Sequence, residues 1–159
     1  MLLAFNRSAL TIGIFIVCAA IVHSANAASP DDACSLLTPA QVGAALGVSI
    51  GAGTYVTPTF KRTCTWNATV NGGGTVTLNL QNPSQYESGK KLASNGKSVS
   101  ASSIGGIGDD AYYFGTDKLV SLIVKKGNVA FKVAVYGPIP IEKQQAAEKS
   151  LASQVASQL

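Results

Sequence analysis

Histidine is almost absent from this chain: the one histidine, His23, lies in an N-terminal segment that we expect to be cleaved off. Without histidine, the Ser-His-Asp and Cys-His mechanisms and the usual zinc sites are excluded from the mature protein. Charged side chains are also scarce, at 13% of the residues, and lysines adjoin one another only at 90–91 and 125–126. Nucleic-acid binding needs a clustered basic face. We therefore expect no nucleic-acid partner.

The first 27 residues have the pattern of a signal peptide. Arg7 supplies the positive charge, an apolar run follows over residues 10–22, and Ala-Asn-Ala at 25–27 is a typical cleavage site. We expect cleavage after residue 27, which removes Cys18 and leaves residues 28–159 as a single domain. The apolar run is short for a membrane span, so an uncleaved anchor is the less favoured alternative. The mature protein is then exported, to the periplasm or outside the cell, with no membrane anchor.

Two cysteines, Cys34 and Cys64, remain after cleavage. In an oxidising compartment the simplest expectation is one disulfide between them, and two free thiols are the alternative. In the chain-entropy model, closing a loop of that length stabilises a fold by about 3 to 4 kcal/mol.

Two segments with different signals predict the first and last helices. Thr38 and Gln41 form a capping-box pattern around Pro39, which predicts a helix of about two turns that ends near Gly47. Apolar residues at helical spacing predict the last helix over about residues 141–159. We expect this last helix to pack on the inner face of a sheet.

A second helix is predicted over about residues 83–94. The cap, proline and glutamine pattern of the first helix recurs at residues 82–85. We expect this helix to bury Tyr86, Leu92 and Ala93.

Alternating hydrophobic residues predict antiparallel strands. Residues 60–68 and 75–81 flank a glycine-rich turn and predict a hairpin, and residues 119–126 and 129–136 predict a second hairpin around Gly127-Asn128. In the second hairpin, three cross-strand pairs would coincide on one apolar face: Val124 with Phe131, Leu122 with Val133, and Val120 with Val135. The predicted fold is α+β, a mainly antiparallel sheet of five to seven strands with about three helices packed on it.

The candidate ligand-binding residues lie around an aromatic strand that follows a glycine-rich turn at 105–108. Trp66, Tyr112 and Tyr113 would line a concavity between sheet and helices, or else are simply core residues. Asp109 and Asp110 are the polar candidates in the turn.

We predict no cofactor and no metal site. Asp109 and Asp110, together with Asp117, would be the ligands if calcium were bound, but their spacing is not that of a known calcium loop. Adjacent aspartates more often serve as turn and cap residues.

Three short motifs occur in a recognisable order: Cys34-Ser35-Leu36-Leu37, Cys64-Thr65-Trp66 and Gly106-Ile107-Gly108-Asp109-Asp110-Ala111. This set resembles a family of small secreted bacterial proteins of unknown function, best known as actinobacterial lipoproteins. The resemblance implies a disulfide between the two cysteines and an α+β fold, and it brings no established catalytic residue to carry over. The chain lacks a lipidated cysteine at its cleavage site, which puts membrane anchoring in doubt.

The leading functional hypothesis is a non-enzymatic module that binds a small ligand or a protein partner in the cell envelope or outside the cell. One alternative is a hydrolase that uses Asp or Ser-Lys chemistry without histidine. Ser88 and Lys91 match a Ser-x-x-Lys motif, but the companion Ser-Asp-Asn and Lys-Thr-Gly motifs are missing. The other alternative is a purely structural accessory protein of the envelope.

Overall fold

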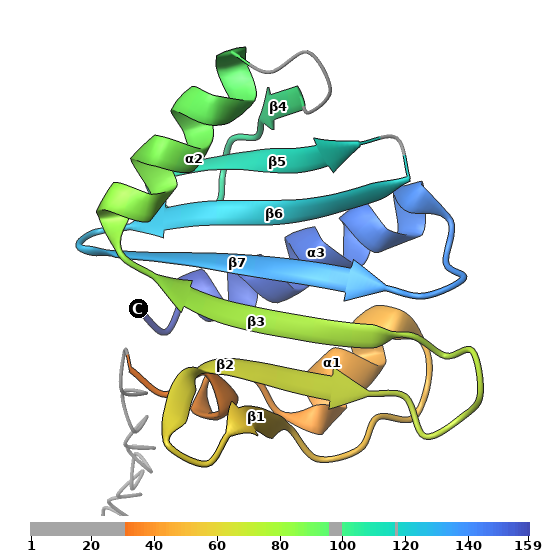
Figure 1. Cartoon of the computed structure of the whole chain (residues 1–159). Helices are drawn as coiled ribbons and strands as arrows, with labels where there is room; N and C mark the ends of the chain where they lie inside the picture. The colour runs from red at the N-terminus through yellow and green to blue at the C-terminus, as the bar shows by residue number, and fades with distance from the viewer. Residues whose placement is uncertain (1–30, 96–99, 117) are drawn as a thin grey trace, which may run out of the picture.

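The computed structural model describes residues 31–95, 100–116 and 118–159. The predicted signal peptide, residues 1–27, lies outside the described residues, and so does Asp117. Within the described ranges, one seven-stranded antiparallel sheet carries three α-helices and a short 3-10 helix (Figure 1). The α+β prediction is confirmed. No helix in this described part is both long and apolar enough to cross a membrane.

The strands lie in the order β1-β2-β3-β7-β6-β5-β4, so the last hairpin is inserted between β3 and β5. The strands are β1 (Thr54–Thr57), β2 (Phe60–Asn67), β3 (Thr75–Gln81), β4 (Ser100–Ser103), β5 (Asp110–Thr116), β6 (Leu119–Lys126) and β7 (Val129–Tyr136). The helices are η1 (Ala33–Ser35), α1 (Pro39–Leu46), α2 (Pro83–Asn95) and α3 (Ile141–Ala156).

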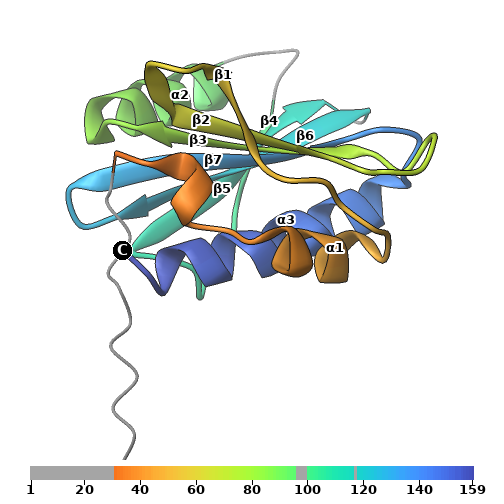
Figure 2. The ribbon, with the colours of Figure 1, turned by 90° about the horizontal axis from the view of Figure 1, so that it is seen from below.

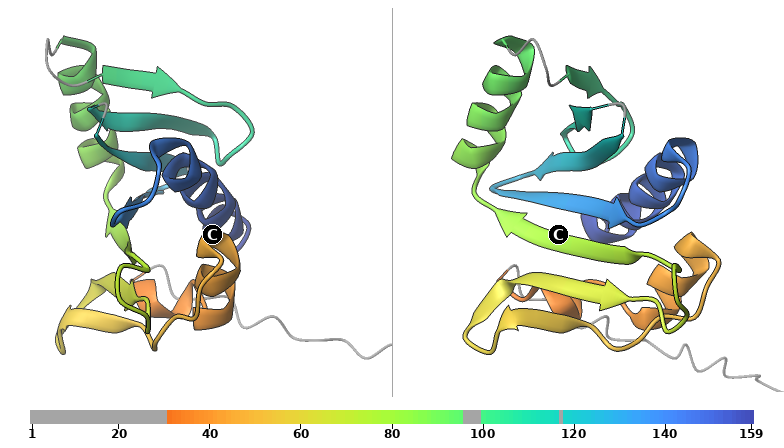
Figure 3. Two further views of the ribbon diagram at one scale, coloured as in Figure 1. Left: turned by 90° about the vertical axis from the view of Figure 1, so that its right-hand side faces the viewer. Right: turned by 45° about the vertical axis from the view of Figure 1, so that its right-hand side comes forward.

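The helices cover both faces of the sheet. Helices α1 and α3 lie together on one face, and α2 lies on the other (Figures 2 and 3). Because side chains alternate across a strand, every second residue of β2, β3, β6 and β7 points toward α1 and α3. These residues form the main core with Leu151 and Val155 of α3. A smaller cluster under α2 contains Tyr86, Tyr112 and Ile123.

Helix capping follows the sequence pattern. The Thr38 Oγ1 atom accepts a hydrogen bond from the Gln41 N–H at 3.2 Å, and Gln41 Oε1 accepts from the Thr38 N–H at 2.8 Å. Gly47 ends α1 with a φ of 72°, which glycine adopts without a steric penalty. At the start of α2, Gln85 Oε1 accepts from the Asn82 N–H at 2.8 Å.

The prediction for the buried face of α2 was right for two residues and wrong for one. Tyr86 and Ala93 are buried, but Leu92 is 66% exposed. Tyr86 and Ala93 are two turns apart and share a stripe, whereas Leu92 lies about 100° around the helix from Ala93. Since α2 touches the sheet along a single stripe, Leu92 faces outward.

Both predicted hairpins form. In the second, Lys126 pairs with Val129 across a two-residue turn, and the ladder includes the predicted pairs Val124 with Phe131 and Leu122 with Val133. The third predicted pair, Val120 with Val135, is not part of the ladder, which ends at Leu122 and Val133. The two strands separate beyond that point.

A disulfide joins Cys34 of η1 to Cys64 of β2, with a Cα–Cα distance of 5.0 Å. Asp32 reinforces this junction, because its Oδ1 atom accepts hydrogen bonds from the Cys34 N–H at 3.1 Å and the Tyr55 hydroxyl at 2.8 Å. The chain before α1 is thereby fixed to the strand that carries Trp66.

Candidate functional site

The fold disperses the candidate aromatic residues. Trp66 is fully buried in the main core on β2, beside the disulfide. Tyr112 is fully buried on the opposite face, with its ring 5.1 Å from that of Tyr86 in an edge-to-face arrangement. Tyr113, the next residue of β5, points instead toward α3 and lines a cavity. Adjacent strand residues face opposite sides of a sheet, so Tyr112 and Tyr113 do not share a site.

The two candidate aspartates hold the local structure together. Asp109 Oδ2 accepts a hydrogen bond from the Gly127 N–H at 2.6 Å, which ties the glycine-rich turn to the β6–β7 turn. Asp110 pairs with Lys90 of α2, and this hydrogen bond holds the pKa of Asp110 below its ordinary value. Within the described residues, no group of three or more His, Cys, Asp or Glu side chains is placed to hold a metal ion. Asp117, the third possible calcium ligand, lies outside them.

Charged side chains surround the Tyr86 ring at the contact of α2 with the sheet. The Lys90 and Lys125 ammonium groups lie 5.8 and 6.0 Å from the ring centroid, and Lys125 also pairs with Glu87 at 2.7 Å. Burial raises the pKa of Tyr86. This cluster anchors α2 on β5 and β6, and partly exposed ion pairs of this kind contribute only modestly to stability.

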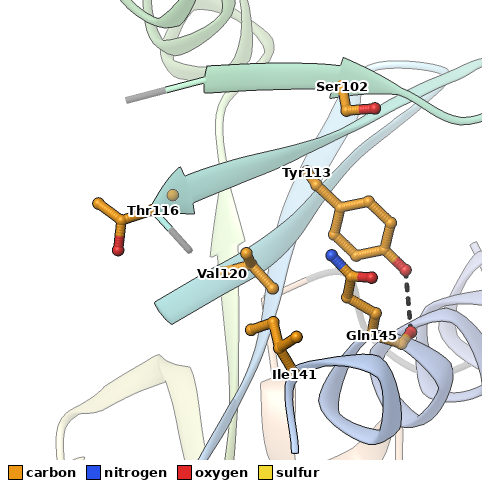
Figure 4. Close-up of a pocket in the computed structure, with 7 residues that line it drawn as sticks. Ser102, Tyr113, Thr116, Val120, Ile141 and Gln145 are labelled. Carbon is orange, nitrogen blue, oxygen red and sulfur yellow. Dashed lines mark hydrogen bonds between the residues drawn. The ribbon is translucent and has the colours of Figure 1, made fainter. Parts of the chain in front are cut away.

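A cavity of about 310 Å³ lies between the β4–β6 end of the sheet and the first turns of α3 (Figure 4). The described residues that line it are Ser102, Tyr113, Gly115, Thr116, Val120, Ile141 and Gln145. They come from four different elements, β4, β5, β6 and α3.

The cavity lining combines apolar and hydrogen-bonding groups. In Figure 4, the Tyr113 ring, Val120 and Ile141 surround the same space as the Gln145 side chain. The Tyr113 hydroxyl donates a hydrogen bond to the Gln145 backbone carbonyl at 2.9 Å and so ties β5 to α3. The Gln145 side-chain amide makes no hydrogen bond within the described part of the chain. None of the described lining residues carries a charge.

The β6–β7 ladder ends at Leu122 and Val133, so the two strands are unpaired at this end of the sheet. Residues 119–121 pair with β5, whereas residues 134–136 pair with β3. Beyond Leu122 the N–H of Val135 has no strand partner on the β6 side, and Glu148 of α3 takes its place. Glu148 Oε1 accepts a hydrogen bond from the Val135 N–H at 3.0 Å. The Glu148 carboxyl therefore satisfies the Val135 N–H where the ladder with β6 does not continue.

Comparisons with known proteins find no match. No family model, no curated protein and no solved structure matches this chain. The motif resemblance to actinobacterial lipoproteins therefore stays a prediction. The function has to be inferred from the geometry of the site.

Glu148, one turn after Gln145 on α3, is a buried acid with a raised pKa. Its side chain is fully buried, and this burial raises its pKa to about 8, although the hydrogen bond from Val135 acts in the opposite direction. Its Oε2 atom and the Oε1 atom of Gln144, one turn earlier on α3, have no hydrogen-bond partner among the described residues. A proton on Oε2 converts that atom into a donor. At neutral pH Glu148 is therefore mostly a neutral acid.

Tyr113 shares this environment. Burial, together with the nearby Glu148 carboxyl, raises the pKa of Tyr113 to about 12, so its hydroxyl stays neutral at physiological pH. The sequence contains one sign that Glu148 is buried. It lies three residues before Leu151 and seven before Val155, so helical spacing places it next to these apolar residues. A charged residue on a buried helical stripe is a candidate for a perturbed pKa.

Proposed function

We propose that this protein is an exported, non-enzymatic binding protein that holds a small uncharged ligand in the cavity between β4–β6 and α3. The observation that carries the proposal is the mixed lining of that cavity, with an aromatic and aliphatic wall beside hydroxyl and amide groups. Ligand sites typically combine a mainly apolar lining with a few polar groups that fix orientation. At about 310 Å³, the volume suits a small ligand.

The electrostatics favour a neutral ligand. No described lining residue is charged. Burial raises the pKa of Tyr113, in the lining, and of Glu148, one turn further along α3, so both groups are neutral at neutral pH. A charged ligand group would lose hydration without gaining a counter-charge. The ligand class with the best fit carries several hydroxyl or amide groups and one apolar face, as an N-acetylated sugar unit does.

Export is part of the proposal. It rests on the signal-peptide pattern of residues 1–27, and the Cys34–Cys64 disulfide is consistent with an oxidising compartment. The native mass of protein purified from an exported preparation tests it directly. We expect cleavage after residue 27, a mass two hydrogens below the dithiol form, and extra mass that disappears on denaturation.

A binding titration with N-acetylglucosamine tests the cavity itself. Gln145→Ala removes the side-chain amide from the lining, and Gln154→Ala is the matched control on the same helix outside the cavity. Losing one hydrogen bond to the ligand should weaken binding by about tenfold in Gln145→Ala and leave Gln154→Ala unchanged. Equal affinity in the wild type, Gln145→Ala and Gln154→Ala would show that the ligand does not bind in this cavity. Turnover of an ester or glycoside that is lost in Asp109→Asn would instead favour the hydrolase alternative.

A further inference from the structure

Glu148 lies on α3 one turn after Gln145, which lines the cavity. Ile141, Gln144, Gln145 and Glu148 follow one another at helical spacing on the side of α3 that faces the sheet. Helical side chains lean toward the N-terminus of their helix, so the Glu148 carboxyl lies over the turn that carries Gln144 and Gln145. The protonation state of this carboxyl therefore affects the turn of α3 that lines the cavity.

Two hydrogen bonds hold that part of α3 to the two sides of the gap in the sheet. On the β5 side, the Tyr113 hydroxyl donates to the Gln145 carbonyl at 2.9 Å. On the β7 side, the Val135 N–H donates to Glu148 Oε1 at 3.0 Å. These two contacts hold the cavity-lining turn of α3 against the sheet, and the contact to Val135 depends on a titratable group.

Among the described residues, no charged group is placed to neutralise a negative charge on Glu148. The core-facing residues of β6 and β7 are aliphatic or aromatic hydrocarbons, and α1 has no titratable side chain. From β5 the only titratable group that faces it is the Tyr113 hydroxyl. On α3 itself, Glu142, Lys143 and Lys149 are exposed. No ion pair among the described residues includes Glu148.

An ionised Glu148 would thus be a buried charge without a partner, which is strongly unfavourable. The charge is relieved if the first turns of α3 move away from β7 and admit water. That movement would take Ile141 and Gln145 with it and open the cavity. The neutral acid, in contrast, keeps the helix in place.

We propose that Glu148 is a pH gate for the ligand cavity: the neutral acid holds α3 against β7 and keeps the cavity formed, and ionisation releases the helix and the ligand together. This inference rests on the proposed function, because it assigns a regulation to the same cavity.

The first experiment measures N-acetylglucosamine affinity at pH 7 and pH 9. With a group that titrates near pH 8, about one molecule in ten is in the binding-competent form at pH 9, so affinity should fall by about tenfold. Glu148→Gln, which stays neutral, should show the same affinity at both values. Exposed Glu142→Gln, on the same helix, should keep the full pH dependence. Affinity that is constant with pH, or that falls equally in Glu148→Gln, would overturn the gate and leave the binding function standing.

The second experiment needs no ligand. It measures the exchange rate of the Val135 amide hydrogen relative to an unstructured peptide at the same pH. Protection of Val135 should fall by about tenfold between pH 7 and pH 9 in the wild type and stay constant in Glu148→Gln. Val133, on the same strand edge but paired with Leu122, is the internal control and should not change. Unchanged protection of Val135 would refute the gate. This test holds even if N-acetylglucosamine binds at neither pH, because it does not depend on the ligand.

Discussion

Replacing Glu148 with glutamine should stabilise this protein at neutral pH and remove a pH dependence of its stability. The native pKa of Glu148 is raised from the ordinary 4.5 to about 8, chiefly by burial. Between these two values the native state keeps a proton that the unfolded state releases. The free energy of unfolding therefore falls as pH rises, by about 1.4 kcal/mol per pH unit. The stabilising contribution is complete below about pH 4.5 and is lost by about pH 8.

The size of the effect follows from this window. At pH 7 the unfolded state releases the Glu148 proton and the native state keeps it, which lowers the free energy of unfolding by about 3 kcal/mol relative to pH 4. Above pH 8 the reduction reaches on the order of 4 to 5 kcal/mol. Glutamine keeps the acceptor for the Val135 N–H and has no proton to lose. Its amide group also offers donors to Gln144 Oε1, which lacks a partner among the described residues. The variant should gain up to about 3 kcal/mol at pH 7 and almost nothing at pH 4.

Urea unfolding at each pH from 4 to 8 measures this directly, with exposed Glu142→Gln as the control on the same helix. The difference between wild type and Glu148→Gln should widen steadily with pH, whereas Glu142→Gln should run parallel to the wild type. Stability curves of wild type and Glu148→Gln that stay parallel, within about 0.5 kcal/mol, would refute the reasoning. Glu148 would then be ionised in the native protein at neutral pH.

Two further predictions concern the disulfide and its neighbourhood. Replacing both Cys34 and Cys64 with alanine should lower the free energy of unfolding by about 3 to 4 kcal/mol, measured by urea unfolding, and an effect below about 1 kcal/mol would show that the bridge does not constrain the unfolded chain. Gly53→Ala should also destabilise the fold, by about 1 to 3 kcal/mol, because its Cβ would lie 2.6 Å from Trp66 Nε1 and 2.7 Å from Cys64 Sγ. Gly105→Ala, where a Cβ meets no atom within 4 Å, is the control and should be nearly neutral in a thermal melt.

Most of the fold followed from local patterns in the sequence. Capping chemistry at Thr38 and Gln41, strict alternation in β3 and the Gly127-Asn128 turn each depend on residues close together in the chain, so their structures could be predicted. Strand β4 could not, because Ser100–Ser103 has neither alternation nor β-branched side chains. It is a strand because the backbone of β5 pairs with it.

The site was less predictable because it depends on where the pairing of β6 with β7 ends. Strand alternation already separates Tyr112 from Tyr113, but which of the two faces α3 depends on the packing of the whole sheet. The gap at Val135 arises only when β6 turns toward β5 and β7 toward β3. The spacing of Glu148 to Leu151 and Val155 indicates burial, but no residue near it in the sequence indicates that it will accept the Val135 N–H.

The strand order has a consequence for how the chain is made. The centre of the sheet is the pairing of β3 with β7, and it joins residues 75–81 to residues 130–136. Until the last hairpin emerges during synthesis, β3 has an open edge and the first three strands have no helix α3 to cover them. Loop closure over such a separation slows folding. An unfinished chain would therefore expose an unpaired strand edge, the kind of surface that chaperones protect, and a truncation before β7 would leave that edge open permanently.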